Sequence, residues 1–188
     1  MTDFFENEKN VREYIASRED FDGRFLIEKL KKYLPNNSTV LELGTGSGYD
    51  LEILNETFQA TGSDNSKAFV KINKQNNPAT KVILLDAETI LTNQKFDCIF
   101  SNKVLHHISR KALVNSIENQ KLTLKPKGLI FHTFWNGKGE NEFHGLHFIK
   151  YEIEELKTLF SEDFKILEID YYQELIANDS IYIIGKLK

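Results

Sequence analysis

Cysteine is nearly absent from this chain, and its scarcity excludes several kinds of protein. Cys98 is the only cysteine among the 188 residues, so neither an internal disulfide nor a zinc site built from several thiolates can form. Its neighbours Asp97, Ile99 and Phe100 favour a buried position in a strand over a catalytic thiol.

Long apolar runs are absent as well. No stretch reaches the ~18 apolar residues of a membrane span, and the acidic, polar N-terminal sequence MTDFFENEKN does not resemble a signal peptide. A hydrophobic content of 40% over 188 residues is ordinary for a globular chain that can bury a core. We therefore expect a cytoplasmic protein that does not associate with membranes.

Basic residues are not in excess either. The chain has 24 Lys and Arg against 28 Asp and Glu, for a net charge of −4. Binding to a polyanion depends on clustered basic side chains, but the groups at 29–32 and 121–127 have acids nearby or lie at the ends of predicted elements. Such groups are typical of solvated helix faces and caps, so a nucleic-acid substrate is disfavoured.

Glycine, by contrast, is concentrated at one point. The segment 40–50, VLELGTGSGYD, is an apolar run containing the acid Glu42, followed by glycines at alternate positions, Gly44, Gly46 and Gly48. Glycine allows backbone angles and close approaches to a ligand that side chains prevent. The segment predicts a buried strand, a ligand-binding turn and a helix start; a tight turn without a ligand is the alternative.

The spacing of these glycines discriminates between ligands. A dinucleotide fingerprint places its third glycine three residues after the second, where this chain has Tyr49. A P-loop needs Lys and Ser or Thr after its last glycine, but Tyr49 and Asp50 follow Gly48. The loop lacks basic residues and lies between the acids Glu42 and Asp50, which favours a cationic or zwitterionic ligand over a pyrophosphate.

The pattern Glu42-x-Gly44-x-Gly46-x-Gly48 resembles motif I of the class I methyltransferases, which use S-adenosylmethionine. This cofactor carries a sulfonium, an ammonium and a carboxylate but no phosphate. The resemblance implies that the turn, with Thr45 in it, lies against the methionine portion of the cofactor. It also implies that Glu42 helps to hold the cofactor's amino group.

Helical and strand patterns alternate along the chain. The predicted helices cover 24–34, 49–58, 67–75, 110–122 and 151–160, and the predicted strands cover 39–43, 59–63, 81–85, 96–101, 129–134, 164–171 and 181–187. Alternation predicts an α/β fold with a doubly wound, mostly parallel sheet, and near-continuous apolar strands predict helices on both faces. The gap between the last two strands is too short for a helical crossover, so they should be antiparallel.

With this ending, the resemblance to class I methyltransferases covers 39–188. It implies a seven-stranded sheet with an antiparallel last strand. We expect a single domain over 1–188, made of an N-terminal helical cap at 1–38 and a Rossmann-like core at 39–188.

Polar residues follow several predicted strands, at the edge where open α/β sheets bind ligands. Asp64 lies 20 positions after Gly44, where a carboxylate can accept both ribose hydroxyls; a helix cap is the alternative. Asn65 would face the adenine. The resemblance implies that Asp86 accepts from the adenine amine and that the Ala87 amide meets a ring nitrogen, again with a cap as the alternative.

The segment 101–108, SNKVLHHI, resembles motif IV of the family, and its ending resembles the members that methylate small molecules. Asn102 and Lys103 should lie beside the methionine portion. The Asn-Pro-Pro-aromatic version, found in enzymes that methylate base or glutamine amides, is absent. DNA, RNA and release-factor substrates are therefore less favoured.

Methyl transfer is an in-line displacement that depends largely on positioning, and a base is needed only where the nucleophile must lose a proton. Of the five histidines, His106 is the candidate base or acceptor contact, with a structural hydrogen bond as the alternative. His107 ranks lower because the next residue of a helical turn points about 100° away. His132, within a strand, should be a core histidine.

Two segments should enclose the acceptor. The segment 135–147 follows the fifth strand on the ligand side, and we expect Trp135, His144 and His147 to contact the acceptor. If helical, it would place both histidines on one face, but a metal would need further ligands and none is expected. The N-terminal segment 4–21 is either a lid that contributes Tyr14 or Arg18, or a helix packed on the edge of the sheet.

The sequence therefore predicts an enzyme that transfers a methyl group from S-adenosylmethionine to a small-molecule acceptor. A non-catalytic S-adenosylmethionine-binding regulator or partner subunit is the main alternative. A protein methyltransferase and an NAD-dependent oxidoreductase are less favoured. The accepting atom and the oligomeric state stay open.

Overall fold

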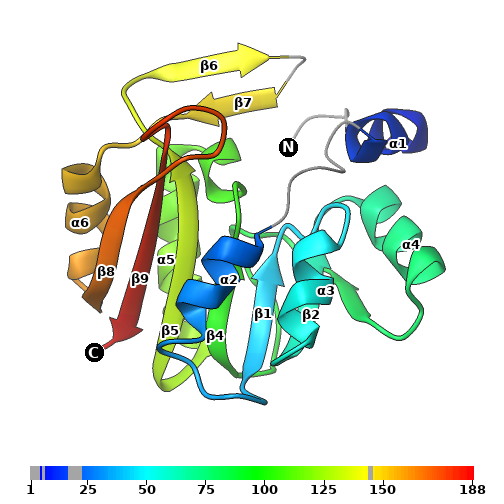
Figure 1. Cartoon of the computed structure of the whole chain (residues 1–188), viewed down its shortest axis with the longest axis horizontal. Helices are drawn as coiled ribbons and strands as arrows, with labels where there is room; N and C mark the ends of the chain where they lie inside the picture. The colour runs from blue at the N-terminus through cyan, green and yellow to red at the C-terminus, as the bar shows by residue number, and fades with distance from the viewer. Residues whose placement is uncertain (1–4, 6, 17–22, 144–145) are drawn as a thin grey trace.

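A seven-stranded sheet forms the centre of the computed structural model (Figure 1), which describes residues 5, 7–16, 23–143 and 146–188. The strands follow the order β3-β2-β1-β4-β5-β9-β8. Their bounds are β1 Thr39–Leu43, β2 Gln59–Asp64, β3 Lys81–Leu84, β4 Phe96–Ser101, β5 Leu124–Trp135, β8 Phe164–Tyr172 and β9 Ser180–Leu187. The pairs among β1 to β5 are parallel, and β9 runs antiparallel to both β5 and β8. The predicted mostly parallel sheet with an antiparallel last strand is confirmed.

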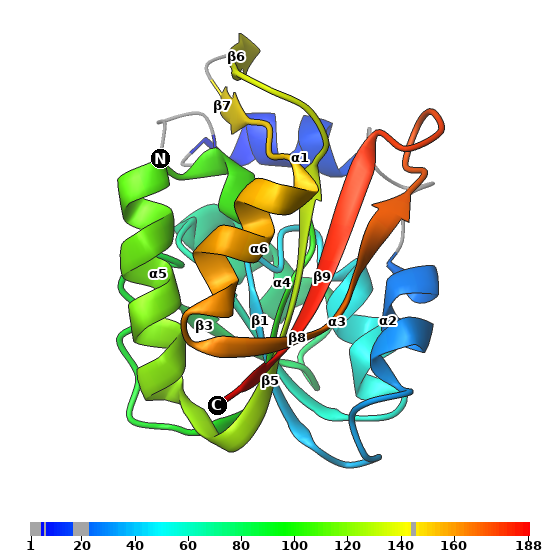
Figure 2. The same cartoon turned by 90° about the vertical axis from the view of Figure 1, so that its left-hand side faces the viewer.

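Helices cover both faces of the sheet (Figure 2). α5 (Arg110–Thr123) and α6 (Ile153–Ser161) lie on one face, and α2 (Arg24–Leu30) and α3 (Tyr49–Asn55) on the other. Because successive strand residues point to opposite faces, Leu41 and Ile99 join the core under α5 and α6, whereas Val40 and Cys98 join the core under α2 and α3. Cys98 is fully buried, as predicted for a structural cysteine.

Serine side chains begin two of the helices. The Ser66 hydroxyl accepts from Phe69 N at 3.2 Å at the start of α4 (Lys67–Asn76), and the Ser109 hydroxyl accepts from Ala112 N at 3.1 Å at the start of α5. Each cap satisfies an amide that has no partner within the helix. The caps fix where the chain turns from the carboxyl edge of the sheet into a helix.

The segment after β5 differs from its sequence-based prediction. It forms an antiparallel hairpin of β6 (Glu140–Phe143) and β7 (Leu146–Ile149). His147 is therefore in a strand, paired with Glu142, and not on a helix face shared with His144, which lies outside the described residues. The alternation of apolar and polar residues over 146–149 is too short to have distinguished this strand from a loop.

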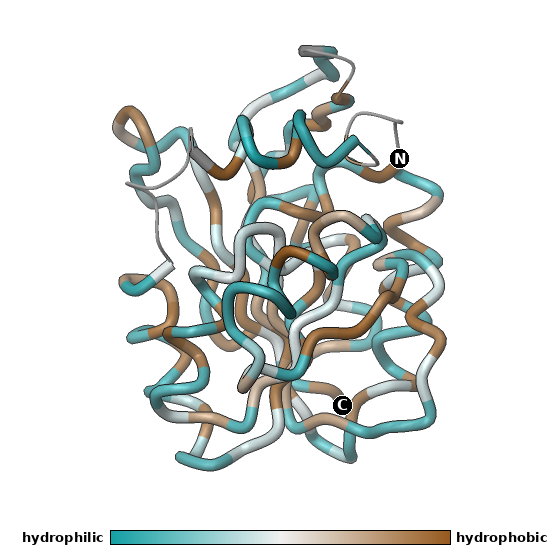
Figure 3. The backbone as a smooth tube through the Cα atoms, turned by 90° about the vertical axis from the view of Figure 1, so that its right-hand side faces the viewer, coloured by the Kyte–Doolittle hydropathy of each residue, from teal (hydrophilic) through white to brown (hydrophobic). Residues whose placement is uncertain are grey.

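Two peripheral elements lie beyond the carboxyl ends of the parallel strands. They are the β6–β7 hairpin and α1 (Glu8–Ala16) (Figure 1). Polar and apolar residues alternate in colour along α1 (Figure 3), and Val11 packs against Phe69 and Ile72 of α4. None of the helices in the described ranges combines the length and apolar character that a bilayer crossing requires.

Candidate active site

A cleft of about 650 Å³, including its open mouth, lies at the carboxyl edge of the sheet. It is lined by Phe5, Tyr14, Gly44, Gly46, Asp64, Asn65, Phe69, Leu85, Ala87, Asn102, Lys103, Val104 and His107. Seven of the eleven residues expected to bind the cofactor are in this set, and the other four are Glu42, Thr45, Gly48 and Asp86. The structure thus brings together residues that follow β1, β2, β3 and β4.

The three glycines of the loop after β1 all have positive φ angles, +66° at Gly44, +49° at Gly46 and +90° at Gly48. A Cβ atom at Gly44 would lie 2.5 Å from a methyl carbon of Val104, and one at Gly48 would lie 2.1 Å from Asn73 Oδ1. At Gly46 the nearest atom would be 3.9 Å away. Gly44 and Gly48 are therefore needed for packing, whereas Gly46 presents bare backbone to the cleft.

Glu42 lies behind this loop. Its side chain is 2% exposed and accepts a hydrogen bond from the Thr45 hydroxyl. Burial, and next the negative charge of Asp50, raise the pKa of Glu42 to about 8. A cation in the cleft would favour the ionised form, because an opposite charge lowers the pKa of a carboxyl group.

Asp64 joins the glycine loop to the start of α4. Its Oδ2 accepts from Gly46 N at 3.0 Å and its Oδ1 from Ser66 N at 2.9 Å, while the side chain is 7% exposed. The side-chain cap of α4 is Ser66, so the cap alternative for Asp64 is not what the structure shows.

Asp86 is placed differently. Its Oδ1 accepts from Glu88 N at 2.8 Å and from Thr89 N at 3.1 Å, and the side chain is exposed and outside the cleft lining. These hydrogen bonds cap a turn, which is the alternative role that we considered for Asp86. The neighbouring Ala87 does line the cleft.

The loop after β4 is held by a relay of hydrogen bonds that includes residues missed in the sequence. Asp50 accepts from Gly23 N at 2.6 Å and from Asn102 Nδ2 at 2.9 Å. Thr133 Oγ1 donates to Asn102 Oδ1 at 2.8 Å and accepts from Lys103 N at 2.8 Å. Since Lys103 has a φ of +56°, these bonds stabilise an uncommon backbone conformation at the cleft. The role of Thr133 could not be predicted from the sequence, because a threonine within an apolar strand does not by itself indicate a particular contact.

Asn73 holds the glycine loop from the side of α4. Its Nδ2 donates to Gly46 O at 2.6 Å and to Phe69 O at 3.0 Å, and the side chain is 5% exposed. The sequence did carry a signal for this residue, because an asparagine on the apolar face of a helix needs a buried hydrogen-bond partner.

Comparisons with known proteins agree with this geometry. Residues 40–128 match the family model described as a methyltransferase domain, whereas no curated protein matches the sequence. An S-adenosylmethionine-dependent methyltransferase from Clostridium acetobutylicum is 15% identical, with a TM-score of 0.76 over 96% of this chain and 99% of that chain. The matched region contains the glycine loop and the strands β1 to β4 that build the cleft.

The chain has the class I methyltransferase fold, and its residues 40–128 match the methyltransferase-domain model.

Two further structures share the fold of this chain. The 1,6-didemethyltoxoflavin-N1-methyltransferase of Burkholderia thailandensis, with bound 1,6-didemethyltoxoflavin and S-adenosylhomocysteine, is 17% identical, with a TM-score of 0.78 over 95% of this chain and 85% of that one. A complex of the Haloferax volcanii Trm112 methyltransferase activator with a methyltransferase matches at 16% identity and a TM-score of 0.81, over 100% of this chain and 99% of that one.

Beneath the cleft, the protein has a buried chain of hydrogen bonds with one consistent direction. Ser101 Oγ donates to His132 Nδ1 at 2.8 Å, and His132 Nε2 donates to Gln120 Oε1 at 2.8 Å. Gln120 Nε2 then donates to Ser116 Oγ at 3.1 Å, and Ser116 Oγ to Ala87 O at 2.6 Å. His132 is thus the predicted core histidine, and the chain connects the loop after β3 to the end of β4.

Tyr14, from α1, lines the cleft. Its ring lies 5.2 Å from that of Phe5 and 6.0 Å from that of Phe69. The N-terminal helix therefore packs on α4 and also borders the cleft. Arg18 lies outside the described residues.

The other predicted acceptor contacts are engaged within the protein. The Lys103 ammonium sits 3.3 Å from the centre of the Trp135 ring and donates to Ser180 Oγ at 2.7 Å. His147 Nε2 lies 3.0 Å from Glu140 Oε2. No group of three or more His, Cys, Asp or Glu side chains in the described ranges is arranged to hold a metal ion.

Proposed function

We propose that this methyltransferase transfers a methyl group from S-adenosylmethionine to a small-molecule acceptor. The observation that carries the proposal is the bare backbone of Gly46 at the cleft, beside the carboxylate of Asp64 and in front of buried Glu42. Such a site offers close backbone contact and negative charge, and the lysine in its lining, Lys103, is held by Trp135 and Ser180. These features fit a sulfonium- and ammonium-bearing ligand.

The cofactor would extend along the cleft from the glycine loop toward Ala87. Gly44, Gly46 and Asn102 would contact its methionine portion, Asp64 its ribose, and Asn65 and Ala87 its adenine. Glu42, Thr45, Gly48 and Lys103 would support the loops around it, with Asp86 reaching the adenine only if it leaves its turn. Bound there, the cofactor supplies an activated methyl group, so the protein's task is chiefly positioning.

A small acceptor is favoured by the rings in the lining of the cleft. Phe5, Tyr14, Phe69 and His107 contribute flat rings to it, which suit a compact organic molecule. The 1,6-didemethyltoxoflavin bound to the Burkholderia thailandensis enzyme is such a molecule. Trp135 and the hairpin around His147 would complete the wall.

Calorimetric titration with S-adenosylmethionine and S-adenosylhomocysteine tests the proposal, with NAD as the control. We expect micromolar dissociation constants for the first two ligands and no heat from NAD. Binding of NAD alone would overturn the proposal. Binding of the two cofactors without turnover on any acceptor would favour a non-catalytic regulator or partner subunit.

A further inference from the structure

Two adjacent histidines at the acceptor end differ in their access to the cleft. His106 is 1% exposed, and both its ring nitrogens are closed off from solvent. His107 is half-buried and lines the cleft. The geometry therefore favours His107 as the candidate base, in place of His106, which the sequence favoured.

A backbone carbonyl determines which nitrogen of His107 carries the proton. His107 Nδ1 lies 2.8 Å from His147 O. A carbonyl oxygen can only accept, so Nδ1 must be the donor, and the lone pair of the neutral ring is on Nε2. The two ring nitrogens point in different directions, so Nε2 is not aimed at the His147 carbonyl.

Neighbouring rings hold this imidazole in place. The Phe148 ring packs against it edge-on at 4.7 Å, and the His106 ring lies at 4.1 Å. Packing of this kind restricts rotation of the ring about its side-chain bonds. His106 and Phe148 thus both help to orient the His107 ring.

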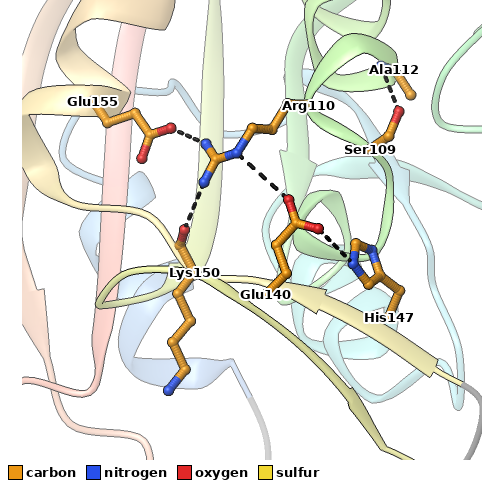
Figure 4. Close-up of polar contacts among 7 residues, drawn as sticks. All are labelled: Ser109, Arg110, Ala112, Glu140, His147, Lys150 and Glu155. Carbon is orange, nitrogen blue, oxygen red and sulfur yellow. Dashed lines mark hydrogen bonds and ion pairs between the residues drawn. The ribbon is translucent and has the colours of Figure 1, made fainter.

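The hairpin that provides the carbonyl is itself anchored by charged groups (Figure 4). Arg110, at the start of α5, pairs with Glu140 of β6 at 3.8 Å and with Glu155 of α6, and its NH2 donates to Lys150 O at 3.4 Å. Glu140 also contacts His147 Nε2 at 3.0 Å. Arg110 is thereby a positioning residue that acts on His107 through the hairpin.

We propose that His107 is the general base of the transfer and that the acceptor is a nucleophile that must lose a proton, such as a phenol, a thiol or an ammonium; this rests on the proposed function. His107 Nε2 takes the proton from the acceptor atom. The acceptor atom forms a bond to the methyl carbon while the bond from that carbon to sulfur breaks. The electron pair stays on sulfur, which leaves neutral S-adenosylhomocysteine, a methylated acceptor and a protonated His107.

A two-bond nitrogen–proton NMR spectrum of the labelled protein tests the geometry without any ligand. The His107 signals, assigned by their loss in His107→Asn, should show a protonated Nδ1 and an unprotonated Nε2 at alkaline pH. A protonated Nε2 would overturn the proposal.

The same variant tests the chemistry. Asparagine places its amide nitrogen near the position of Nδ1, so His107→Asn keeps a donor for His147 O while it removes the base. With phenol, thiol and alkylamine probes, kcat should fall about 100-fold or more while KM for S-adenosylmethionine stays unchanged. Wild-type kcat in the variant would refute the proposal.

Formation of S-adenosylmethionine from S-adenosylhomocysteine and iodomethane is the matched control, because the accepting sulfur carries no proton. His107→Asn should retain this reaction at the wild-type rate. Equal losses in both reactions would indicate a merely structural role and overturn the proposal. Failure of the wild-type protein to bind S-adenosylhomocysteine would be a different result, which overturns the proposed function itself.

Discussion

At the scale of the residue, Asp64 has the most consequential position in the cleft. One carboxylate oxygen accepts from the glycine loop and the other from the start of α4. The same group borders the cleft, where ribose hydroxyls could use its remaining lone pairs. Experiments can separate the contribution of Asp64 to folding from its contribution to ligand binding.

We expect Asp64→Ala to weaken S-adenosylmethionine binding at least about tenfold, because two hydroxyls lose a shared charged acceptor. Calorimetric titration measures the change, with unfolding temperatures to confirm that the variant is folded. Asp170→Ala, on the edge strand β8, serves as the control and should leave affinity unchanged. A folded Asp64 variant with wild-type affinity would remove this residue from the site.

At the scale of the element, a cluster of polar side chains fastens α2 to the antiparallel end of the sheet. Glu168 of β8 accepts from Lys29 Nζ at 3.0 Å, from the Tyr33 hydroxyl at 2.7 Å and from the Tyr182 hydroxyl. Burial by itself would raise the pKa of Glu168, but hydrogen bonds from Tyr182, Tyr33 and Lys29 outweigh it and lower the pKa to about 2.

This cluster predicts an acid-sensitive contribution to stability. The folded pKa of Glu168 is about 2, below the unfolded value of about 4.3, so the folded state favours the ionised form. The contribution is complete above about pH 4.3 and is lost as the pH falls toward about 2. Glu168→Gln should lower the free energy of unfolding at neutral pH. In this variant the free energy of unfolding should also fall less between about pH 4.3 and about pH 2. Glu154→Gln, exposed on α6, is the control; an unchanged acid limb in Glu168→Gln would contradict the prediction.

At the scale of the whole molecule, the buried chain through His132 joins the sheet to α5 beneath the cleft. Burial lowers the pKa of His132 to about 3, so its imidazole is neutral in the folded protein. The unfolded value is about 6.5. Protonation therefore favours unfolding, and stability declines as the pH falls from about 6.5 toward about 3.

Denaturant unfolding between about pH 6.5 and about pH 3 should show this decline in stability. The decline should begin well above the pH range in which Glu168 becomes protonated. His132→Gln should be less stable at neutral pH, because Ser101 and Gln120 lose their buried partner, yet its stability should change less between about pH 6.5 and pH 4.5. His147→Gln, at a side chain that is 42% exposed, controls for the loss of an exposed histidine. A wild-type slope in His132→Gln would show that another group controls the decline.

The sequence by itself determined the layered fold and seven of the residues that line the cleft. Alternating helical and strand patterns specify which segments lie in the sheet, because each must bury an apolar face. The carboxyl ends of parallel strands share an edge, so residues such as Gly44, Asp64 and Asn102 could be brought together without coordinates. The order of residue types along the chain is sufficient for these predictions.

Only the tertiary structure decided the contacts between segments distant in sequence. It moved the candidate base from His106 to His107, because burial and the carbonyl of His147 act on neighbouring residues differently. It also showed that Asn73 and Thr133 hold the loops after β1 and β4. Their roles depend on directional hydrogen bonds across elements, and residue spacing along the chain does not encode the direction in which a side chain finally points.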